Sequence, residues 1–286
     1  MSLVTLKSVI TDSIEKRYAI GAFNFNGIED ALGIIDAAEE KNSPVILMAS
    51  TSAVDYFGGA AAVAGFVKAL AAKSSAPIVL HVDHCGSYEM IKACVDSGFS
   101  SVMIDASKAD FEENIARTAE VVKYARKFGC SVEGELGRIG GREENVDVSD
   151  REKNMTDPDT VAEFVERTGV DALAISIGNA HGFYKGTPKL DFDRIVKIRS
   201  LIDCGLVLHG GTGIPESDFV HAVECGMNKI NVGTELKFCC SQTARKVFDE
   251  KPDEIDIRKL VGSNRQACKE IVLHKMDLFG STGKAF

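Results

Sequence analysis

Three histidines of this chain share one local setting, and their side chains are ligands that zinc prefers. His84, His181 and His209 each lie at or just after the end of a short apolar segment, in LHVDH, ISIGNAH and LVLH. A single histidine in such a place is more often a hydrogen-bonded structural residue, and we expect His81, two residues before Asp83, to be one. Three imidazoles that converge and leave one position open are the ligand set of a catalytic zinc site. The sequence therefore predicts zinc where these three segments meet.

Two glycine-containing turns have the composition of an anion site. One is Gly210-Gly211-Thr212-Gly213, directly after His209, and the other runs from Asn231 to Thr234 through Gly233. Glycine lets backbone N–H groups approach an anion closely, and hydroxyl groups add hydrogen-bond donors. Either turn alone is weak support, because glycine is common in loops. Together they predict a phosphate site.

Eight short apolar segments, each followed by a helical pattern, must position these residues. They begin at Ala19, Pro44, Ala76, Ser101, Ser131, Ala172, Leu206 and Lys229. Runs of this kind are buried on both faces of parallel sheets. Repeated βα units build either an open doubly wound sheet or a closed barrel, and eight units of uniform style favour closure because a closed ring has no edge strands. The predicted fold class is α/β, a single (β/α)8 TIM barrel over residues 1–286 with additional C-terminal helices over about 252–286.

Helix signals between these segments agree with this order. Asp157 is a candidate N-cap with Pro158 at the first helical position, and Pro215 opens a helix in the same way. A long helix from Leu236 and one or two further helices follow the last segment, and they are candidates for a subunit contact.

Active sites of such barrels are built from the loops at the carboxyl ends of the strands. The polar residues at those ends are Asn24, Asn26, Ser50, Asp83, His84, Asp105, Glu135, Asn179, His181, His209, Asn231 and Thr234. The loop over residues 137–156 is far longer than the usual βα connection. It is either a disordered insertion or a lid that brings Glu143 or Glu144 to the substrate.

Composition excludes several classes of function. The 286 residues include 33 Lys and Arg against 42 Asp and Glu, a net charge of −9. Such a chain has no general attraction for nucleic acid or anionic lipid, so an anionic substrate must be held by local groups. No segment approaches the ~20 apolar residues that span a bilayer, and no signal peptide is visible. We expect a cytoplasmic protein whose eight cysteines are reduced thiols.

The sequence resembles the class II, zinc-dependent ketose-bisphosphate aldolases, which include fructose-bisphosphate and tagatose-bisphosphate aldolases. The resemblance covers essentially the whole chain. It rests on YAIGAFNFN, SPVIL, LHVDHC, SVMIDAS, VEGELGRIGG, IGNAHGFYKGTPKL, LVLHGGTGIP and KINVGTEL.

The resemblance implies a role for each matching residue. Zinc would be held by His84, His181 and His209, with Asp105 and Glu135 near a second or displaced metal position. Asp83 would act as acid and base at the C4 hydroxyl and Glu143 at C3. The residues that match substrate or phosphate contacts are Asn24, Ser50, Gly182, Gly210, Gly211, Thr212, Asn231, Gly233, Thr234 and Arg258.

The resemblance also implies a reaction and partners. The reaction is reversible metal-dependent cleavage of a ketose 1,6-bisphosphate to dihydroxyacetone phosphate and an aldehyde such as glyceraldehyde 3-phosphate. A sodium or potassium ion often lies near the phosphate, and the protein would be a homodimer or homotetramer. Arg258 matches an arginine that binds the distal phosphate, in some members from a neighbouring subunit.

Departures from the family pattern at three places concern the aldehyde half of the substrate. Gly233 replaces an Asp or Asn of many fructose-bisphosphate members, and Thr51-Ser52 and Ile257 also differ from the family pattern. Tagatose bisphosphate or another ketose 1-phosphate is therefore an alternative substrate. A metal-dependent sugar-phosphate isomerase or epimerase, or a non-catalytic metabolite-binding protein, is a more distant alternative.

Overall fold

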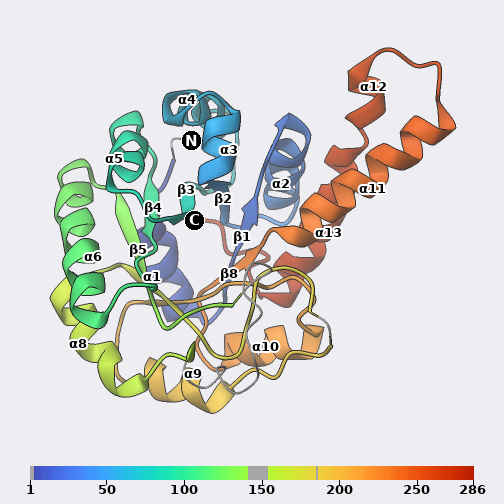
Figure 1. The fold of residues 1–286 in the computed structure, drawn as a ribbon. Helices are drawn as coiled ribbons and strands as arrows, with labels where there is room; N and C mark the ends of the chain where they lie inside the picture. Colours follow the sequence, from blue (N-terminus) through green and yellow to red (C-terminus); the bar gives the residue numbers. More distant parts are fainter. Residues whose placement is uncertain (1–2, 141–153, 185) are drawn as a thin grey trace.

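The computed structural model describes residues 3–140, 154–184 and 186–286, and over them it is a closed barrel of eight parallel strands (Figure 1). The strands are β1 (Ile20–Asn24), β2 (Val45–Ser50), β3 (Ile78–Cys85), β4 (Ser101–Ile104), β5 (Ser131–Leu136), β6 (Ala172–Ile175), β7 (Gly205–Leu208) and β8 (Lys229–Val232). Each strand pairs with its sequence neighbours, and β8 closes the ring on β1. The predicted (β/α)8 barrel is confirmed.

Helices surround the barrel and extend beyond it. They are α1 (Leu6–Lys16), α2 (Ile28–Glu40), α3 (Thr51–Tyr56), α4 (Ala60–Ala71), α5 (Tyr88–Ser97), α6 (Phe111–Ala125), α8 (Pro158–Thr168), α9 (Phe192–Arg199), α10 (Glu216–Glu224), α11 (Thr234–Glu250), α12 (Ile257–Val261) and α13 (Asn264–Leu278). A short 3-10 turn, Arg126–Phe128, follows α6. No helix among the described residues is long and apolar enough to cross a membrane.

Local signals set most helix ends. The Asp157 side chain accepts a hydrogen bond from the backbone N–H of Asp159, and Pro158 begins α8, as the sequence predicts. The prediction for Pro215 was wrong by one residue: Pro215 is itself the N-cap of α10, which begins at Glu216. Its extended ψ of 145° places it outside the helix.

Two apolar layers stabilise the barrel. The larger layer lies between the strands and the surrounding helices. The smaller layer fills the barrel interior and includes Ile20, Ile46 and Val79 together with Val9 and Ile10 of α1. Helix α1, which the sequence analysis did not identify, contacts β1, β5 and β7. Its buried face, spaced at helical intervals, therefore completes the inner core.

The C-terminal helices divide into two parts. Helix α13 packs closely against α2. Gly33 of α2 permits this approach because it has no side chain: a Cβ there would lie 2.4 Å from the Arg265 carbonyl oxygen. Helix α11 begins at Thr234, two residues earlier than predicted, and with α12 forms an arm that projects away from the barrel (Figure 1).

Candidate active site

The three histidines converge at the carboxyl end of the barrel, as the sequence predicts. His84 comes from β3, His181 from the loop after β6, and His209 directly follows β7. One ring nitrogen from each lies within 4.8 Å of the other two. The closest pair is His84 Nε2 and His209 Nδ1, at 2.7 Å.

An irregularity in β3 turns His84 toward its partners. The pairing of β3 with β4 shifts register between Val82 and Cys85, which is the mark of a β-bulge. His84 adopts a left-handed φ of 48°, a conformation that is uncommon for a residue other than glycine. Such strain persists only where the surroundings fix it and is frequent at functional sites.

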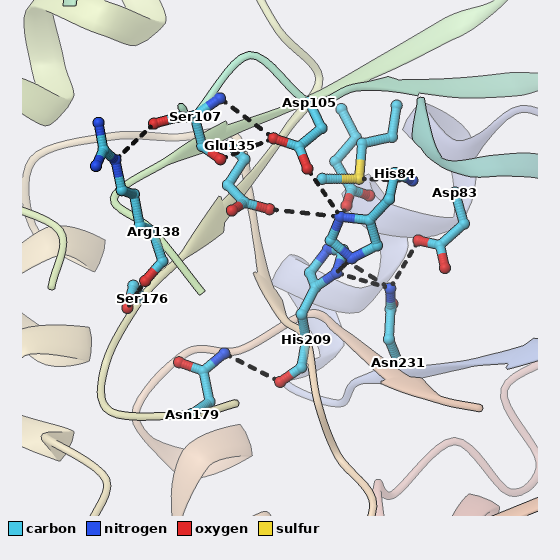
Figure 2. A network of polar contacts seen from close by, with 12 residues as sticks. Asp83, His84, Asp105, Ser107, Glu135, Arg138, Ser176, Asn179, His209 and Asn231 are labelled. Carbon is cyan, nitrogen blue, oxygen red and sulfur yellow. Dashed lines mark hydrogen bonds and ion pairs between the residues drawn. The ribbon is translucent and has the colours of Figure 1, made fainter. Parts of the chain in front are cut away.

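Two carboxylates lie on the other side of His84. Asp105 Oδ2 lies 3.2 Å and Glu135 Oε2 lies 3.9 Å from His84 Nδ1 (Figure 2). Burial by itself would lower the pKa of His84, but Asp83, Asp105 and Glu135 outweigh it and raise that pKa to about 9. Burial, with Asp105 nearby, raises the pKa of Glu135 to about 8.

This donor set fits a divalent metal ion. Burial lowers the pKa of His181 to about 4 and that of His209 well below its ordinary value, so both rings are neutral and able to bind metal. His181 Nε2 is buried and has no hydrogen-bond partner among the described residues. His84, Asp105 and Glu135 form a second candidate group that shares His84 with the first. Three imidazoles suit zinc, copper, iron or nickel.

Asp83 is held by two amides at the edge of the histidine cluster. Asn24 Nδ2 donates to Asp83 Oδ2 at 3.1 Å, and Asn231 Nδ2 lies 3.3 Å from Asp83 Oδ1. Burial alone would raise the pKa of Asp83, but its charged neighbours, His84 foremost, outweigh burial and lower the pKa below the usual range. Asp83 is therefore a carboxylate with both oxygens held in place.

A cavity of about 210 Å³ opens beside the cluster. Its lining residues are Asn24, Ser50, Asp83, His84, His181, Gly182, His209, Gly210, Gly211, Thr212, Asn231, Gly233, Thr234 and Lys237. Every predicted substrate or phosphate residue except Arg258 lies in this lining. The cavity ends at the N-terminus of α11, where the helix dipole favours an anion.

Gly233 and Asn24 share one space in the cavity wall. A Cβ at Gly233 would lie 2.3 Å from Asn24 Oδ1. Any larger side chain at this position would displace Asn24, which holds Asp83 here. The Gly233 departure noted in the sequence is thus coupled to the position of Asn24.

Arg258 does not reach the cavity of its own barrel. It lies on α12, its side chain is 87% exposed, and its guanidinium pairs with Asp256 two residues earlier. Figure 1 shows α12 at the far end of the arm.

Glu143 and Glu144 lie outside the described residues. The described part of their loop ends at Gly140, whose carbonyl oxygen accepts a hydrogen bond from His181 N–H at 2.8 Å. This segment also forms a parallel bridge with Ala180. The loop therefore leaves the barrel beside a candidate metal ligand.

Sequence reasoning missed three charged residues of the site. Lys237 lines the cavity. Glu133 and Lys229 are fully buried beneath the histidines and form an ion pair of 2.9 Å. Glu133 stands two residues before Glu135, so both side chains point to the same face of β5, and this spacing was the available signal.

Comparisons with known proteins agree with this geometry. The family described as fructose-bisphosphate aldolase class-II matches residues 4–284. A fructose-bisphosphate aldolase of Geobacillus stearothermophilus is 45% identical over 287 aligned positions, which cover 100% of this chain and 99% of the relative. A probable fructose-bisphosphate aldolase of Bacillus subtilis is also 45% identical and is covered completely.

Two solved structures share the fold and 33–39% sequence identity. The YdjI aldolase of Escherichia coli K12 has a TM-score of 0.85 and 39% identity, covering 99% of this chain and 100% of that one. A putative fructose-1,6-bisphosphate aldolase of Coccidioides immitis has a TM-score of 0.86 and 33% identity, with 98% and 97% covered.

Proposed function

The chain belongs to the class II fructose-bisphosphate aldolase family, and from this premise we propose how its residues divide the work of cleaving fructose 1,6-bisphosphate. The observation that supports the proposal is the convergence of three imidazoles beside Asp83 and a cavity that ends in glycine-rich turns. The names of the relatives favour fructose bisphosphate over tagatose bisphosphate.

The metal of the proposed site is zinc, held by His84, His181 and His209. Bound there, it would supply Lewis-acid stabilisation for negative charge on the ketose oxygens. Asp105 and Glu135 would offer a second position that shares His84.

Asp83 is the proposed base at the C4 hydroxyl. Its lowered pKa keeps it ionised, and the amides of Asn24 and Asn231 fix both of its oxygens. Removal of the hydroxyl proton lets the C3–C4 bond break, which releases the aldehyde and leaves the electron pair on the ketose half. A positioned general base typically contributes about 10²–10⁴-fold to the rate.

Glu143 is the proposed acid that returns a proton to C3. Support comes from Gly140, which hydrogen-bonds His181 and stands three residues before Glu143 in the chain. Three residues of extended chain span up to about 10 Å, which is sufficient to reach the cavity from there.

The ketose phosphate is proposed to bind at the turns after β7 and β8. Gly210, Gly211 and Thr212 lie on one side, and Asn231 and Thr234 on the other. The backbone N–H groups of such turns and the start of α11 attract anions. Gly182 and Ser50 also line the cavity, and a sodium or potassium ion beside the phosphate would offset part of its charge.

The proposed assembly is a homodimer or homotetramer in which Arg258 serves a neighbouring subunit. Ile255 is 95% exposed and Ile257 is 58% exposed on the arm. Apolar side chains exposed beside a projecting helix are typical of subunit contacts.

The decisive experiment is a coupled cleavage assay with fructose 1,6-bisphosphate, tagatose 1,6-bisphosphate and ketose monophosphates, with zinc present and removed by a chelator. Chelation should abolish turnover, and zinc should restore it. Borohydride added with substrate should trap no adduct, because Lys229, which lies beneath the histidines, is engaged by Glu133. A trapped lysine adduct would overturn the proposal. Full turnover by Asp83→Asn would instead favour an isomerase or epimerase.

A further inference from the structure

A charged layer lies inside the barrel, directly beneath the histidine cluster. Glu133, Lys229 and His81 have no exposed surface. Burying a carboxylate and an ammonium group costs several kcal/mol per ion unless each is paired. Apolar side chains in the same place would avoid this cost, so we expect the contacts of the charged groups to serve a function.

One oxygen of Glu133 contacts a candidate metal ligand. Glu133 Oε1 lies 2.8 Å from His209 Nε2. A carboxylate can only accept a hydrogen bond, so the hydrogen of the neutral His209 ring is on Nε2. The lone pair of the ring is then on Nδ1, the nitrogen that faces His84 at 2.7 Å.

Asn231 agrees with the same tautomer from a different direction. Its Nδ2 lies 3.2 Å from His209 Nδ1 and 3.5 Å from His209 Nε2, so the shorter contact is the one to Nδ1. An amide nitrogen can only donate, so Nδ1 is the acceptor in this contact as well.

The other oxygen of Glu133 is held by Lys229. Lys229 Nζ lies 2.9 Å from Glu133 Oε2, and both side chains are fully buried. His81 Nε2 lies farther from the same oxygen, at 3.9 Å, and His81 Nδ1 is occupied by Ser101 Oγ at 2.8 Å. Lys229 is therefore the group that fixes the carboxylate beneath His209.

We propose that Glu133 is a positioning residue that holds His209 as the Nε2–H tautomer with Nδ1 directed at the metal, and that Lys229 fixes Glu133 for this purpose. This inference rests on the proposed zinc site. A carboxylate behind a metal-binding histidine fixes the ring and its tautomer, and its loss typically lowers metal affinity by about 10–100-fold.

Two double variants test whether Glu133 positions His209 or only fills space in the core. Glu133→Leu with Lys229→Met replaces the ion pair by apolar side chains and leaves His209 Nε2 without its acceptor. Glu133→Gln with Lys229→Met is equally uncharged but keeps an acceptor oxygen. Replacing a buried ion pair by apolar residues is often neutral for stability, so both chains should fold.

The readout is the zinc dissociation constant, measured by competition with a chromogenic chelator on the full chain, with thermal unfolding as a check of folding. The Leu/Met variant should bind zinc about 10–100-fold more weakly than the unmodified chain, and the Gln/Met variant should recover most of that loss. Ser101→Ala removes the hydrogen bond of His81 in the same layer and should leave zinc affinity unchanged. Equal affinities for the two paired variants would overturn the inference.

A second measurement needs no substitution. Nitrogen NMR of the zinc-loaded chain should show the His209 hydrogen on Nε2, and a hydrogen on Nδ1 would overturn the inference even if the variants fail to fold. Failure of the unmodified chain to bind zinc would count against the proposed function, whereas tight binding with no difference between variants counts only against the role of Glu133.

Discussion

Gly210 offers a sharp test of how the site is held together. It follows His209 directly, adopts a left-handed φ of 68°, and packs against the segment that carries His181. A Cβ at this position would lie 2.1 Å from the Ala180 carbonyl oxygen and 3.3 Å from His181 N. Gly210→Ala therefore presses on the backbone of one candidate metal ligand from the residue next to another.

The size of the effect follows from these distances. Ordinary contact begins at 3.4 Å, so the Ala180 carbonyl oxygen at 2.1 Å must retreat by about 1.3 Å, or the strand end must move instead. Functional side chains tolerate roughly 0.5 Å, and a displacement of about 1 Å can cost ~10²-fold in rate. The left-handed conformation of alanine adds about 1–2 kcal/mol of destabilisation.

Gly213→Ala is the matched control. Gly213 also has a left-handed φ, of 86°, but a Cβ there would meet only Tyr184 Cδ2 at an ordinary 3.4 Å. Both variants should lose about 1–2 kcal/mol of stability from the backbone conformation. Gly210→Ala alone should also lose about 10²-fold in kcat/KM and bind zinc at least about tenfold more weakly. Equal zinc affinity and activity in the two variants would refute the idea that this close approach positions His181.

Three other substitutions test separate parts of the structure. Asp83→Asn should lower cleavage by about 10²–10⁴-fold in the coupled assay while zinc content stays at the level of the unmodified chain, and a parallel loss of zinc would show that Asp83 serves the metal site instead. Ile10→Ala should cost about 2–5 kcal/mol, because Ile10 is 2% exposed in the inner core, and differential scanning calorimetry should show a lower Tm with kcat/KM at 25 °C unchanged. Arg258→Ala should raise KM for fructose 1,6-bisphosphate while leaving proton exchange at C3 of dihydroxyacetone phosphate intact, and an unchanged KM would remove Arg258 from substrate binding.

The barrel itself was readable from the sequence because parallel strands buried on both faces must be short apolar runs. Six of the eight predicted segments contain their whole strand, whereas β3 ends one residue later, at Cys85, and β7 begins one residue earlier, at Gly205. Helix α1 was not anticipated, although its buried positions Leu6, Val9, Ile10 and Ser13 have helical spacing. The residue pattern shows that this segment has an apolar face. Only the closed barrel shows what that face covers, namely one open end of the barrel interior.

The site was predictable in its residue types and less so in its geometry. Strand ends identified His84, Asp83 and Asn231 because the barrel gathers those ends at one mouth. The bulge that turns His84 inward depends on how β3 registers with β4, which no local pattern encodes. The position of Arg258 could not be predicted from the local sequence either. It lies on an exposed arm, so any role in substrate binding depends on another subunit.

The order of strands around the ring also explains how an acidic protein can hold an anionic substrate. Asp105 and Glu135 extend from β4 and β5, whereas the proposed phosphate turns follow β7 and β8, and in a closed ring of eight strands β4 lies opposite β8. Coulomb repulsion falls with distance, so this strand order keeps the carboxylates of Asp105 and Glu135 away from the phosphate. Asp83, which lines the same cavity as those turns, is offset by the amide groups of Asn24 and Asn231. Local dipoles and strand order, rather than net charge, therefore make the phosphate side of the mouth suitable for an anion.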